Sequence, residues 1–511
     1  MTEFRIERVA EALANANLLV EMRGELPAIA HGITDDSRAV QPGVLFVAVR
    51  GSAKDGHDFL SAAAERGATA AIVEDASRTT LPALVVRDGR RAAAIAAAAV
   101  YGEPVRDLRL LAVTGTNGKT TTVGILRHLL DEESRRSASG SQAARSASHS
   151  QAARSASIGT LGVLIGSEGV ELPGGSGLTT PGPIELQRVL RALVDAGVRT
   201  VAMEVSSHSL DQRRVEGLRF AAGVFTNLTR DHLDYHGTME HYLAAKAKLV
   251  EYLEPGGAGV VNADDPAWDA LPPAPRTIRF SAGARVADVY ARRVTFSPRG
   301  SEWTLHAPEF RPAKVRLPLI GDFNVANAVG AAAAAFAVGV PVNVIAERLS
   351  TLPQVPGRLE MIGERPTVLR DYAHTPDALE RALDAVRPFA TRRLIVVFGC
   401  GGDRDRGKRP EMGAIAERKA DLAVLTSDNP RTEDPARILD DVEAGMTGTN
   451  HLRVEDRREA IANALATASP DDVVVLAGKG HETYQIRGTT KYPFDEKAIV
   501  RELMAEGVAG S

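Results

Sequence analysis

An apolar segment, a glycine-containing turn and an amphipathic segment follow one another at LRLLAVTGTNGKTTTVGILRHLLDEE, residues 108–133. This order predicts a buried strand that passes through a tight turn directly into a helix. Further strand candidates alternate with helical segments at TVAMEVS (200–206), FAAGVFTN (220–227) and GAGVVNA (257–263). Such alternation favours a mostly parallel sheet, so the sequence predicts an α/β protein.

The chain of 511 residues is long enough for about three domains. Residues 1–106 mix short β-rich runs such as VLFVAV (44–49) and AAIVE (70–74) with the helical FLSAAAERG, which predicts a small N-terminal α/β domain. Residues 107–354 form the predicted central domain with the glycine turn and the mostly parallel sheet. Residues 355–511 contain the strands RLIVVFG, LAVLTS and VVVLAG, which predict a Rossmann-like C-terminal domain.

Composition excludes several classes of protein. A net charge of −4 and a pI near 6.3 argue against a general nucleic-acid binder. The single cysteine, Cys400, excludes an intramolecular disulfide and a cysteine-based zinc site, and we expect it to be a small buried residue. No segment has the roughly 20 consecutive apolar residues of a membrane span. We therefore expect a soluble cytoplasmic monomer without membrane or nucleic-acid partners.

Residues 134–157 fit no predicted core. They contain SQAARSAS twice and lack any large apolar residue. The composition predicts a disordered, solvent-exposed Ser/Ala/Arg insertion. A basic tether for an acidic partner is the alternative.

The turn at residues 114–120 has the composition of a phosphate-binding loop. Backbone N–H groups at Gly115 and Gly118 can approach a phosphate chain, Lys119 can neutralise it, and Thr120 can hold Mg²⁺. The loop departs from the strict pattern because Val113 occupies the place of the first glycine. A tight turn with an incidental lysine is the alternative interpretation.

Two further polar residues follow predicted strands. Glu204 lies in MEVSSHSLDQRR and His232 in FTNLTRDHLDYHG, both just past the carboxyl ends of strands, where open α/β sheets bind ligands. Each alone is more often merely solvated. Together with the glycine turn they predict a Mg²⁺ site with oxygen and nitrogen ligands.

These motifs resemble the Mur ligases of peptidoglycan synthesis. The resemblance runs in the family's order from DDSRAVQPGVLFVAV to GKGHE, nearly the whole chain. It rests on TGTNGKTTT, TTP (179–181), MEVSSH, FTNLTRDHLDYHG, GDFNVANA (321–328), VPGRLE (355–360), DYAHTPDAL (371–379), FGCGGDRDRGKRPEM, SDNPRTEDP and GKGHETYQ. Within the family, the set is most similar to the members that add 2,6-diaminopimelate to UDP-N-acetylmuramoyl-L-alanyl-D-glutamate.

The resemblance implies an ATP- and Mg²⁺-dependent ligase of peptidoglycan precursor synthesis, and hence a role in cell shape and division. The family transfers the γ-phosphoryl group of ATP to a carboxylate, here that of D-glutamate. An amine, here of meso-2,6-diaminopimelate, then displaces phosphate from the acyl-phosphate. Such chemistry depends on positioning and charge neutralisation more than on a protein nucleophile.

The resemblance also assigns site residues. The catalytic and metal-binding residues are Lys119, Thr120, Glu204, His232 and Lys246, the last as a carbamate. The ATP-binding residues are Gly115, Thr116, Asn117, Gly118, Lys119, Thr120, Thr121, Asn324 and His374. The UDP-linked acceptor falls at Ser37, Ser52, Ala53 and Lys54 in the first domain, and at Thr179, Thr180, Ser206, Gln212 and Arg214 in the second. The diaminopimelate-binding residues are Arg404, Asp428, Asn429, Pro430, Arg431, Gly478 and Glu482.

Several of these assignments reverse or qualify a simpler interpretation. Lys246 on the helix EHYLAAKAKLV would otherwise be predicted to lie on a solvated face. Leu178 stands where relatives often have an asparagine before the threonine pair, which puts one acceptor contact in doubt. Arg431 and Arg404 can each pair with a carboxylate, and diaminopimelate has one more carboxylate than lysine.

Two other functions are compatible with parts of this pattern. The first keeps the ligase and changes the amine to L-lysine or another diamino acid, which Arg431 disfavours. The second is a nucleotide-binding scaffold without catalysis, which the presence of Lys119, Glu204 and Lys246 disfavours. By analogy with the family we also expect hinges near residues 105–108 and 353–357.

Overall fold

The computed structural model describes residues 2–51, 54–131, 154–173, 177–283, 286–297 and 299–509. Its contacts divide the chain into two compact units. The first comprises residues 1–290, 307–310 and 327–345, and the second comprises residues 291–306, 311–326 and 346–511. Both contain parallel sheets covered by helices, which confirms the α/β prediction. Among the described helices, none combines the length and the apolar composition needed to cross a bilayer.

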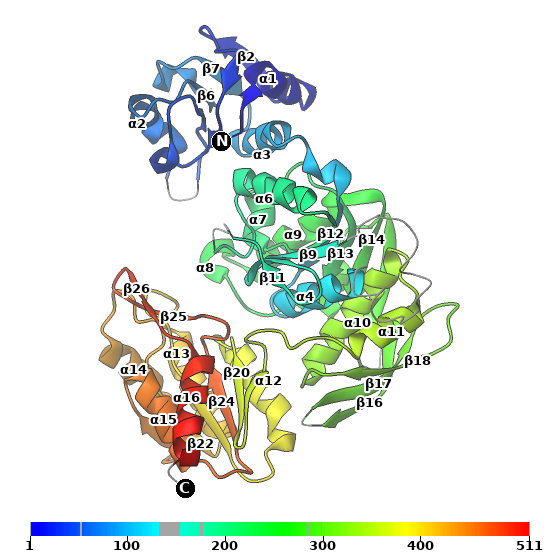
Figure 1. The fold of residues 1–511 in the computed structure, drawn as a ribbon, viewed down its shortest axis with the longest axis vertical. Coiled ribbons are helices and arrows are strands. Elements are labelled where there is room, and N and C mark those ends of the chain that lie inside the picture. The colour runs from blue at the N-terminus through cyan, green and yellow to red at the C-terminus, as the bar shows by residue number, and fades with distance from the viewer. Residues whose placement is uncertain are drawn as a thin grey trace. The chain divides into compact units, whose positions relative to one another are not determined.

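The N-terminal domain is built on a five-stranded sheet with the order β2-β7-β6-β5-β4. Strands β4 to β7 run parallel, and β2 pairs antiparallel with β7 at the edge. Helices α1 and α3 pack on one face and α2 on the other (Figure 1). The bounds are β1 Phe4–Arg5, α1 Ile6–Asn15, β2 Leu19–Arg23, β3 Ile29–Ala30, β4 Ile33–Thr34, β5 Leu45–Val47, α2 Leu60–Glu65, β6 Ala70–Val73, β7 Ala83–Val86 and α3 Gly89–Val100.

The central sheet has the order β11-β10-β9-β12-β8-β13-β14-β15-β16-β17-β18. Strands β9, β12, β8, β13, β14, β15 and β16 are parallel, so their carboxyl ends share one edge. The bounds of this region are β8 Arg109–Thr114, α4 Lys119–Leu130, β9 Arg154–Gly159, β10 Gly162–Ile165, β11 Val170–Glu171, α6 Pro183–Asp195, β12 Val198–Glu204, α7 Ser207–Asp211, β13 Phe220–Phe225, α8 Leu233–His236, α9 Met239–Ala247, β14 Leu253–Asn262, β15 Arg276–Ser281 and β16 Val289–Ser297.

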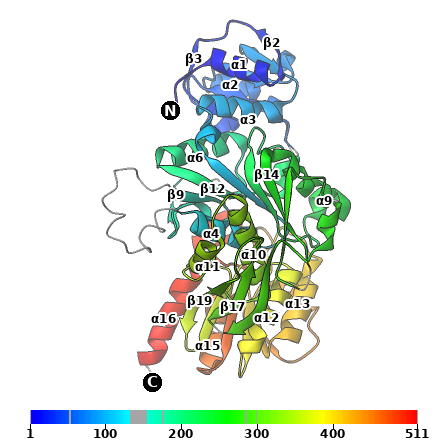
Figure 2. The same ribbon diagram turned by 90° about the vertical axis from the view of Figure 1, so that its right-hand side faces the viewer.

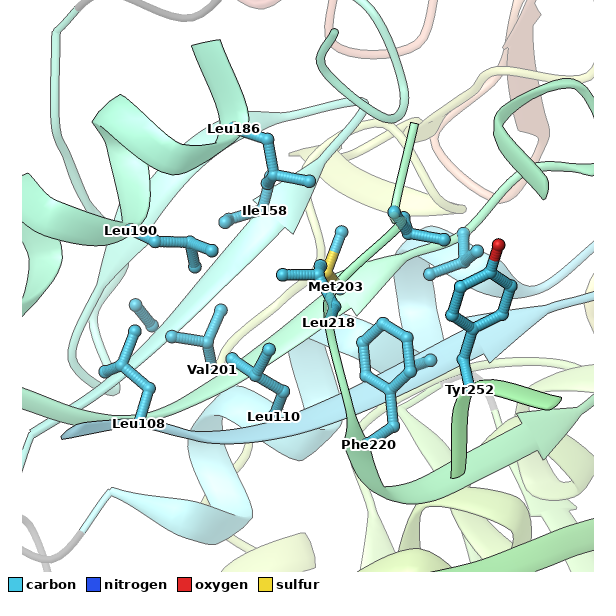
Figure 3. Packing of buried hydrophobic residues seen from close by; sticks show 14 of the residues in the cluster. Leu108, Leu110, Ile158, Leu186, Leu190, Val201, Met203, Leu218, Phe220 and Tyr252 are labelled. Atoms are coloured by element: carbon cyan, nitrogen blue, oxygen red, sulfur yellow. The ribbon is translucent and has the colours of Figure 1, made fainter. Parts of the chain in front are cut away.

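Alternate residues of these strands divide the apolar core between the two faces of the sheet. Leu110 of β8, Ile158 of β9 and Met203 of β12 pack against Leu186 and Leu190 of α6 (Figure 3). Helix α4 covers β9 and β12 on the other face. Because successive side chains of a strand point to opposite faces, both faces of the sheet are apolar and each is covered by helices.

The predicted insertion at residues 134–157 is wrong at its end. Residues 154–157 form the start of β9, and Ser155 and Ser157 are buried. The polar groups of Ser155 are satisfied: its Oγ donates to the Arg127 carbonyl at 2.6 Å, and its N–H donates to Asp131 Oδ1 at 3.1 Å. A buried strand can thus be rich in serine, because small hydroxyls are tolerated where partners exist. The rest of the predicted insertion lies outside the described residues.

The second unit contains a six-stranded sheet of order β19-β20-β24-β21-β22-β23, parallel except at β19. Helices α12, α13 and α14 cover one face, and α15 and α16 cover the other (Figure 1). This arrangement confirms the predicted Rossmann-like fold. The bounds are β19 Glu360–Glu364, β20 Thr367–Asp371, α12 Pro376–Val386, β21 Leu394–Phe398, α13 Lys408–Lys419, β22 Leu422–Leu425, α14 Pro435–Glu443, β23 His451–Arg453, α15 Arg457–Thr467, β24 Val473–Ala477, β25 Tyr484–Arg487, β26 Thr490–Pro493 and α16 Glu496–Ala509.

The last two strands of the central sheet, β17 and β18, pair antiparallel, and two helices follow them in the chain, labelled in part in Figure 2. Their bounds are β17 Gly300–His306, β18 Ala313–Leu317, α10 Asp322–Ala337 and α11 Val342–Leu349. Cys400 is buried after β21, as predicted.

Candidate active site

The glycine turn joins β8 to α4 as the sequence predicts. Gly115 and Gly118 have φ values of 147° and 84°, which favour glycine. A Cβ on Gly115 would collide with the Thr226 hydroxyl, and one on Gly118 with the Asn327 side chain. Both glycines are therefore required for the close approach of neighbouring segments as well as for the turn.

The segment after β13 holds this loop in place. The Asn117 N–H donates to Asn227 Oδ1 at 2.9 Å, and Thr226 Oγ1 donates to the Asn117 carbonyl at 2.7 Å. Thr116 Oγ1 accepts from the Thr229 N–H at 3.0 Å. Because β13 is the parallel neighbour of β8, the two segments leave the sheet side by side. The loop is thus preorganised by side chains outside its own motif.

Two lysines converge on the loop. Lys119 Nζ donates to the carbonyls of Gly115 and Thr116 at 3.0 and 2.7 Å. Lys246 Nζ, from helix α9, donates to the same Gly115 carbonyl at 2.8 Å. The structure therefore brings together two residues that lie 127 positions apart in the sequence.

Lys246 is buried. The helix pattern alone predicts a solvated lysine, and only the resemblance to the family pointed the other way. Lys246 is 1% exposed, and its Nζ lies 4.4 Å from the centre of the Tyr242 ring. Burial lowers the pKa of Lys246 well below its usual value of 10.5, and the charge of Lys119 lowers it further. Burial therefore favours the neutral, nucleophilic amine of Lys246 over its charged form.

His232 lies close to both lysines. Burial lowers the pKa of His232, and the charges of Lys119 and Lys246 act in the same direction while Asp231 opposes them. The residue has a left-handed backbone with φ 53°, and the His208 ring lies 4.8 Å from its ring. Burial and the neighbouring histidines lower the pKa of His208 to about 4. Both imidazoles are neutral at pH 7, the form that can bind a metal.

Glu204 ends β12 and is 1% exposed. Its Oε1 accepts from the Thr160 N–H at 2.8 Å, and its Oε2 accepts from the Thr160 hydroxyl at 3.2 Å. Since Glu204 pairs in register with Val113 of β8, its carboxylate stands at the same sheet edge as the glycine turn. A buried carboxylate at this edge is a suitable cation ligand.

Residues predicted to bind the acceptor surround Thr180, beside Glu204. The Thr180 hydroxyl donates to the Glu204 carbonyl at 2.9 Å and accepts from the Ser206 N–H at 3.1 Å. Arg214 donates to the Thr180 carbonyl at 3.0 Å and to Gln212 Oε1 at 2.7 Å. The four residues form one network.

The other predicted acceptor residues are placed separately. The Thr179 hydroxyl lies 3.3 Å from that of Thr160, while Leu178 is 47% exposed. In the N-terminal domain, the Ser37 carbonyl accepts from Arg66, and the Lys54 carbonyl accepts from the Gly51 N–H at 2.9 Å. Ser52 and Ala53 lie outside the described residues.

The predicted diamino-acid site forms a second network, in the second unit. Asn429 Nδ2 donates to Glu482 Oε2 at 2.9 Å, and Asp428 Oδ1 lies 3.3 Å from Lys479 Nζ. Gly478 has φ 112°, and a Cβ there would approach Asp428 Oδ2 to 3.1 Å. The structure thus joins the DNPR turn, after β22, to the GKGHE segment, after β24.

At this site Arg404 is exposed and Arg431 is half-buried. Arg431 has φ 53°, its N–H donates to the Ile486 carbonyl at 3.1 Å, and its guanidinium donates to the Gly402 carbonyl at 2.7 Å. Arg404 donates to the Asp403 carbonyl at 2.9 Å. The turn is therefore held by backbone bonds that leave donors of Arg431 for a ligand.

Asn324 and His374 also belong to the second unit. Asn324 Nδ2 donates to the Ile320 carbonyl at 2.8 Å, and His374 Nδ1 lies 2.8 Å from the Tyr372 carbonyl. Their assignment to ATP stays a prediction. Asn327, three residues after Asn324, is the one whose side chain abuts Gly118 within the first unit.

Sequence reasoning missed several residues that build these sites. They are Thr226, Asn227 and Thr229 beside the loop, Tyr242 beside Lys246, Asn327 beside Gly118, and Lys479 beside the DNPR turn. Their signal was available in part: a polar run TNLT follows an apolar strand, and a lysine follows the buried run VVVLAG. Both strands end at the ligand-binding edge of a parallel sheet.

Comparisons with known proteins decide the family. Family models match three consecutive parts of the chain: "Mur ligase family, catalytic domain" at residues 29–111, "Mur ligase middle domain" at 113–335 and "Mur ligase, glutamate ligase domain" at 357–480. The chain belongs to the Mur ligase family. Members are ATP-dependent ligases that form amide bonds, so the nucleotide-binding and ligase predictions are confirmed at that level.

Similar Mur ligases extend over nearly the whole chain. A protein of Geobacillus thermodenitrificans named UDP-N-acetylmuramoyl-L-alanyl-D-glutamate--2,6-diaminopimelate ligase is 44% identical, with 92% of this chain and 94% of that protein covered. One of the same name from Geobacter metallireducens is 43% identical over 95% and 97%. A solved structure under that name superposes with a TM-score of 0.66 at 34% identity, covering 96% and 98%. The recognised resemblance is thereby confirmed.

Proposed function

We propose that this Mur ligase adds meso-2,6-diaminopimelate to the D-glutamate carboxylate of UDP-N-acetylmuramoyl-L-alanyl-D-glutamate. The observation that carries the proposal is the DNPR turn with its guanidinium at Arg431 and the carboxylate of Glu482 linked through Asn429. One end of diaminopimelate has an ammonium and a carboxylate, which need an anion and a cation respectively. The relatives that share the name of this reaction, similar over more than nine-tenths of the chain, support the same substrates.

The reaction has two steps. An oxygen of the acceptor carboxylate attacks the γ-phosphorus of ATP, the bond to the bridging oxygen breaks, and ADP leaves. The amine of diaminopimelate then attacks the acyl carbon, the carbon–oxygen bond to phosphate breaks, and a proton leaves the nitrogen. Phosphate is a far better leaving group than the carboxylate oxygen, which is why ATP is spent.

The chain's own groups position and neutralise these charges. Helix α4 begins at Lys119 directly after the glycine turn, so its first N–H groups are available to a phosphate chain. The Lys119 ammonium lies against the same turn, at the Gly115 carbonyl. The network of Thr180, Ser206, Gln212 and Arg214 holds the acceptor beside Glu204. Positioning and electrostatic stabilisation are the main contributions of enzymes to phosphoryl transfer.

Mg²⁺ fits the donors at the sheet edge when the nucleotide completes them. Within the described part of the chain, no three His, Cys, Asp or Glu side chains are clustered enough to hold a metal alone. The proposed ligands are Thr120, Glu204, His232 and a carbamate on Lys246, together with phosphate oxygens. Bound Mg²⁺ supplies charge neutralisation of the phosphates.

Carbamoylation of Lys246 supplies the missing anion. The neutral amine of Lys246 attacks CO₂, a nitrogen–carbon bond forms, and a proton is released to water. Burial lowers the pKa of Lys246 and so favours the neutral amine that this step needs, and the product carbamate is negatively charged. The anion lies beside Lys119, which favours it electrostatically.

Phosphate release from ATP tests this function. The acceptor is UDP-N-acetylmuramoyl-L-alanyl-D-glutamate, with meso-diaminopimelate and L-lysine in parallel reactions. We expect turnover with diaminopimelate and little with lysine. Turnover with lysine alone would overturn the assignment of Arg431, and none with either would favour a scaffold without catalysis. Because ATP and UDP-linked precursors are cytoplasmic metabolites, we also propose a cytoplasmic location.

A further inference from the structure

Lys479 is a fully buried cation that no step of the proposed reaction uses. It follows β24, and its side chain is 0% exposed. Its Nζ lies 3.3 Å from Asp428 Oδ1, 3.1 Å from Asn429 Oδ1 and 3.4 Å from Glu482 Oε2. Burial of a charge is costly unless it is paired, so this ammonium ties together the three side chains that hold it.

The first consequence concerns Asn429. Its Oδ1 accepts from Lys479 Nζ and from the Ile486 N–H at 2.9 Å. Two donors on one oxygen set the orientation of the amide, because a flipped amide would place its NH₂ group against both. The Nδ2 group therefore faces Glu482 Oε2, at 2.9 Å.

The second consequence concerns Glu482. Its contacts with Lys479 and Asn429 both go to Oε2. Oε1 accepts no hydrogen bond from any residue that the structure describes. One oxygen of the carboxylate is thus held by the protein, while the other keeps its acceptor capacity for a ligand ammonium.

We propose that Lys479 is a positioning residue that determines diamino-acid selectivity, by holding Asn429 and Glu482 in the orientation that receives the amino-acid end of the substrate. The inference rests on the proposed function, because it assigns Glu482 to the ammonium of diaminopimelate. Without Lys479, the carboxylates of Asp428 and Glu482 lose the cation between them and repel each other. The turn that carries Arg431 then loses its register with Glu482.

The test is Lys479→Met, which removes the ammonium at similar volume. We expect the KM for diaminopimelate to rise about 10- to 100-fold, as for a misplaced binding group, and the preference over lysine to shrink. The KM values for ATP and the acceptor stay unchanged, because their residues lie elsewhere. An unchanged KM for diaminopimelate in a folded variant overturns the proposal.

A matched control separates positioning from general stability. Arg393→Met also takes an ion pair from a buried carboxylate, that of Asp472, which lies at the amino end of β24 while Lys479 lies past its carboxyl end; Asp472 then keeps only the more distant Arg392, at 4.0 Å. It is expected to lower the melting temperature without moving the KM for diaminopimelate. An equal rise of that KM in Arg393→Met would attribute the effect of Lys479→Met to destabilisation and overturn the proposal.

A second variant covers the case in which Lys479→Met does not fold. Lys479→Met combined with Asp428→Asn restores the charge balance of the cluster. We expect the double variant to regain thermal stability relative to Lys479→Met while its KM for diaminopimelate stays above that of Asp428→Asn alone. Equal KM values in those two variants would show that Lys479 only balances charge, and the proposal would fail.

The wild-type measurement distinguishes the two proposals. A wild-type enzyme that uses lysine, or no diamino acid, refutes the proposed substrate whatever Lys479 does. A wild-type enzyme that prefers diaminopimelate, with Lys479→Met unchanged in KM and selectivity, refutes the role of Lys479 alone.

Discussion

Replacement of Arg431 by alanine removes the guanidinium proposed to bind the distal carboxylate of diaminopimelate. The backbone of the turn should survive, because its bonds to Ile486 and Gly488 use main-chain atoms: the Arg431 N–H donates at 3.1 Å and its carbonyl accepts at 2.7 Å. The internal side-chain contact that is lost is the one to the Gly402 carbonyl. The change therefore acts mainly on the ligand.

The magnitude follows from the type of bond. A hydrogen bond between charged groups contributes about 1.5–3 kcal/mol, which corresponds to roughly 10- to 150-fold in kcat/KM. We expect a loss of this size for diaminopimelate and none for ATP. Arg431→Lys should fall between, because an ammonium is a point charge and lacks the planar fork of the guanidinium.

Arg431→Gly is the control for backbone strain. Arg431 has φ 53°, where a residue with a Cβ costs about 1–2 kcal/mol relative to glycine. Glycine and alanine variants should therefore differ in melting temperature but share the same rise in KM for diaminopimelate. Phosphate release at varied diaminopimelate, with saturating ATP and acceptor, measures it. An unchanged KM in both variants, or a rise that follows only the loss of stability, would refute the carboxylate contact.

Three further predictions follow from the site and its surroundings. Lys246→Met should lower kcat about 10²- to 10³-fold, as expected for loss of an electrostatic stabiliser, and removal of CO₂ should slow the wild type until bicarbonate is restored, as phosphate release can show. Gly118→Ala should abolish ADP binding in calorimetry because its Cβ meets Asn327, whereas Gly102→Ala, with a similar φ of 73° and no atom within 4 Å, should bind normally. The side-chain hydrogen bond from Arg409 lowers the pKa of Glu433 from 4.5 to about 2, so Glu433 stabilises the fold above pH 4.5 and this contribution is lost as the pH falls through 2. Urea unfolding should show that Glu433→Gln is less stable than wild type at pH 7, and that the difference in unfolding free energy shrinks as the pH falls from 4.5 to 2. A difference that does not change with pH would contradict this prediction.

The structure extends what could be predicted about the phosphate loop. Its strand, turn and helix are local, and β8 and α4 occur where the pattern LRLLAVTGTNGKTTT places them. Its support is not local: Asn227 follows a different strand, and Asn327 belongs to α10. Such contacts depend on which strands are neighbours in the sheet, and the strand order cannot be predicted from the sequence of the loop.

The sequence by itself determined the α/β class, the glycine turn and the placement of Glu204 at a strand end, because these follow from short-range periodicity and turn chemistry, whereas His232, predicted just past a strand, lies at the start of helix α8. Only the tertiary structure decided burial. It buried the side chains of Lys246 and Lys479 and turned Ser155 and Ser157 into a core strand, contrary to what their composition indicates. The physical reason is that a polar side chain is buried when distant residues satisfy it, and those partners, such as the Gly115 carbonyl for Lys246, come together only in the folded chain.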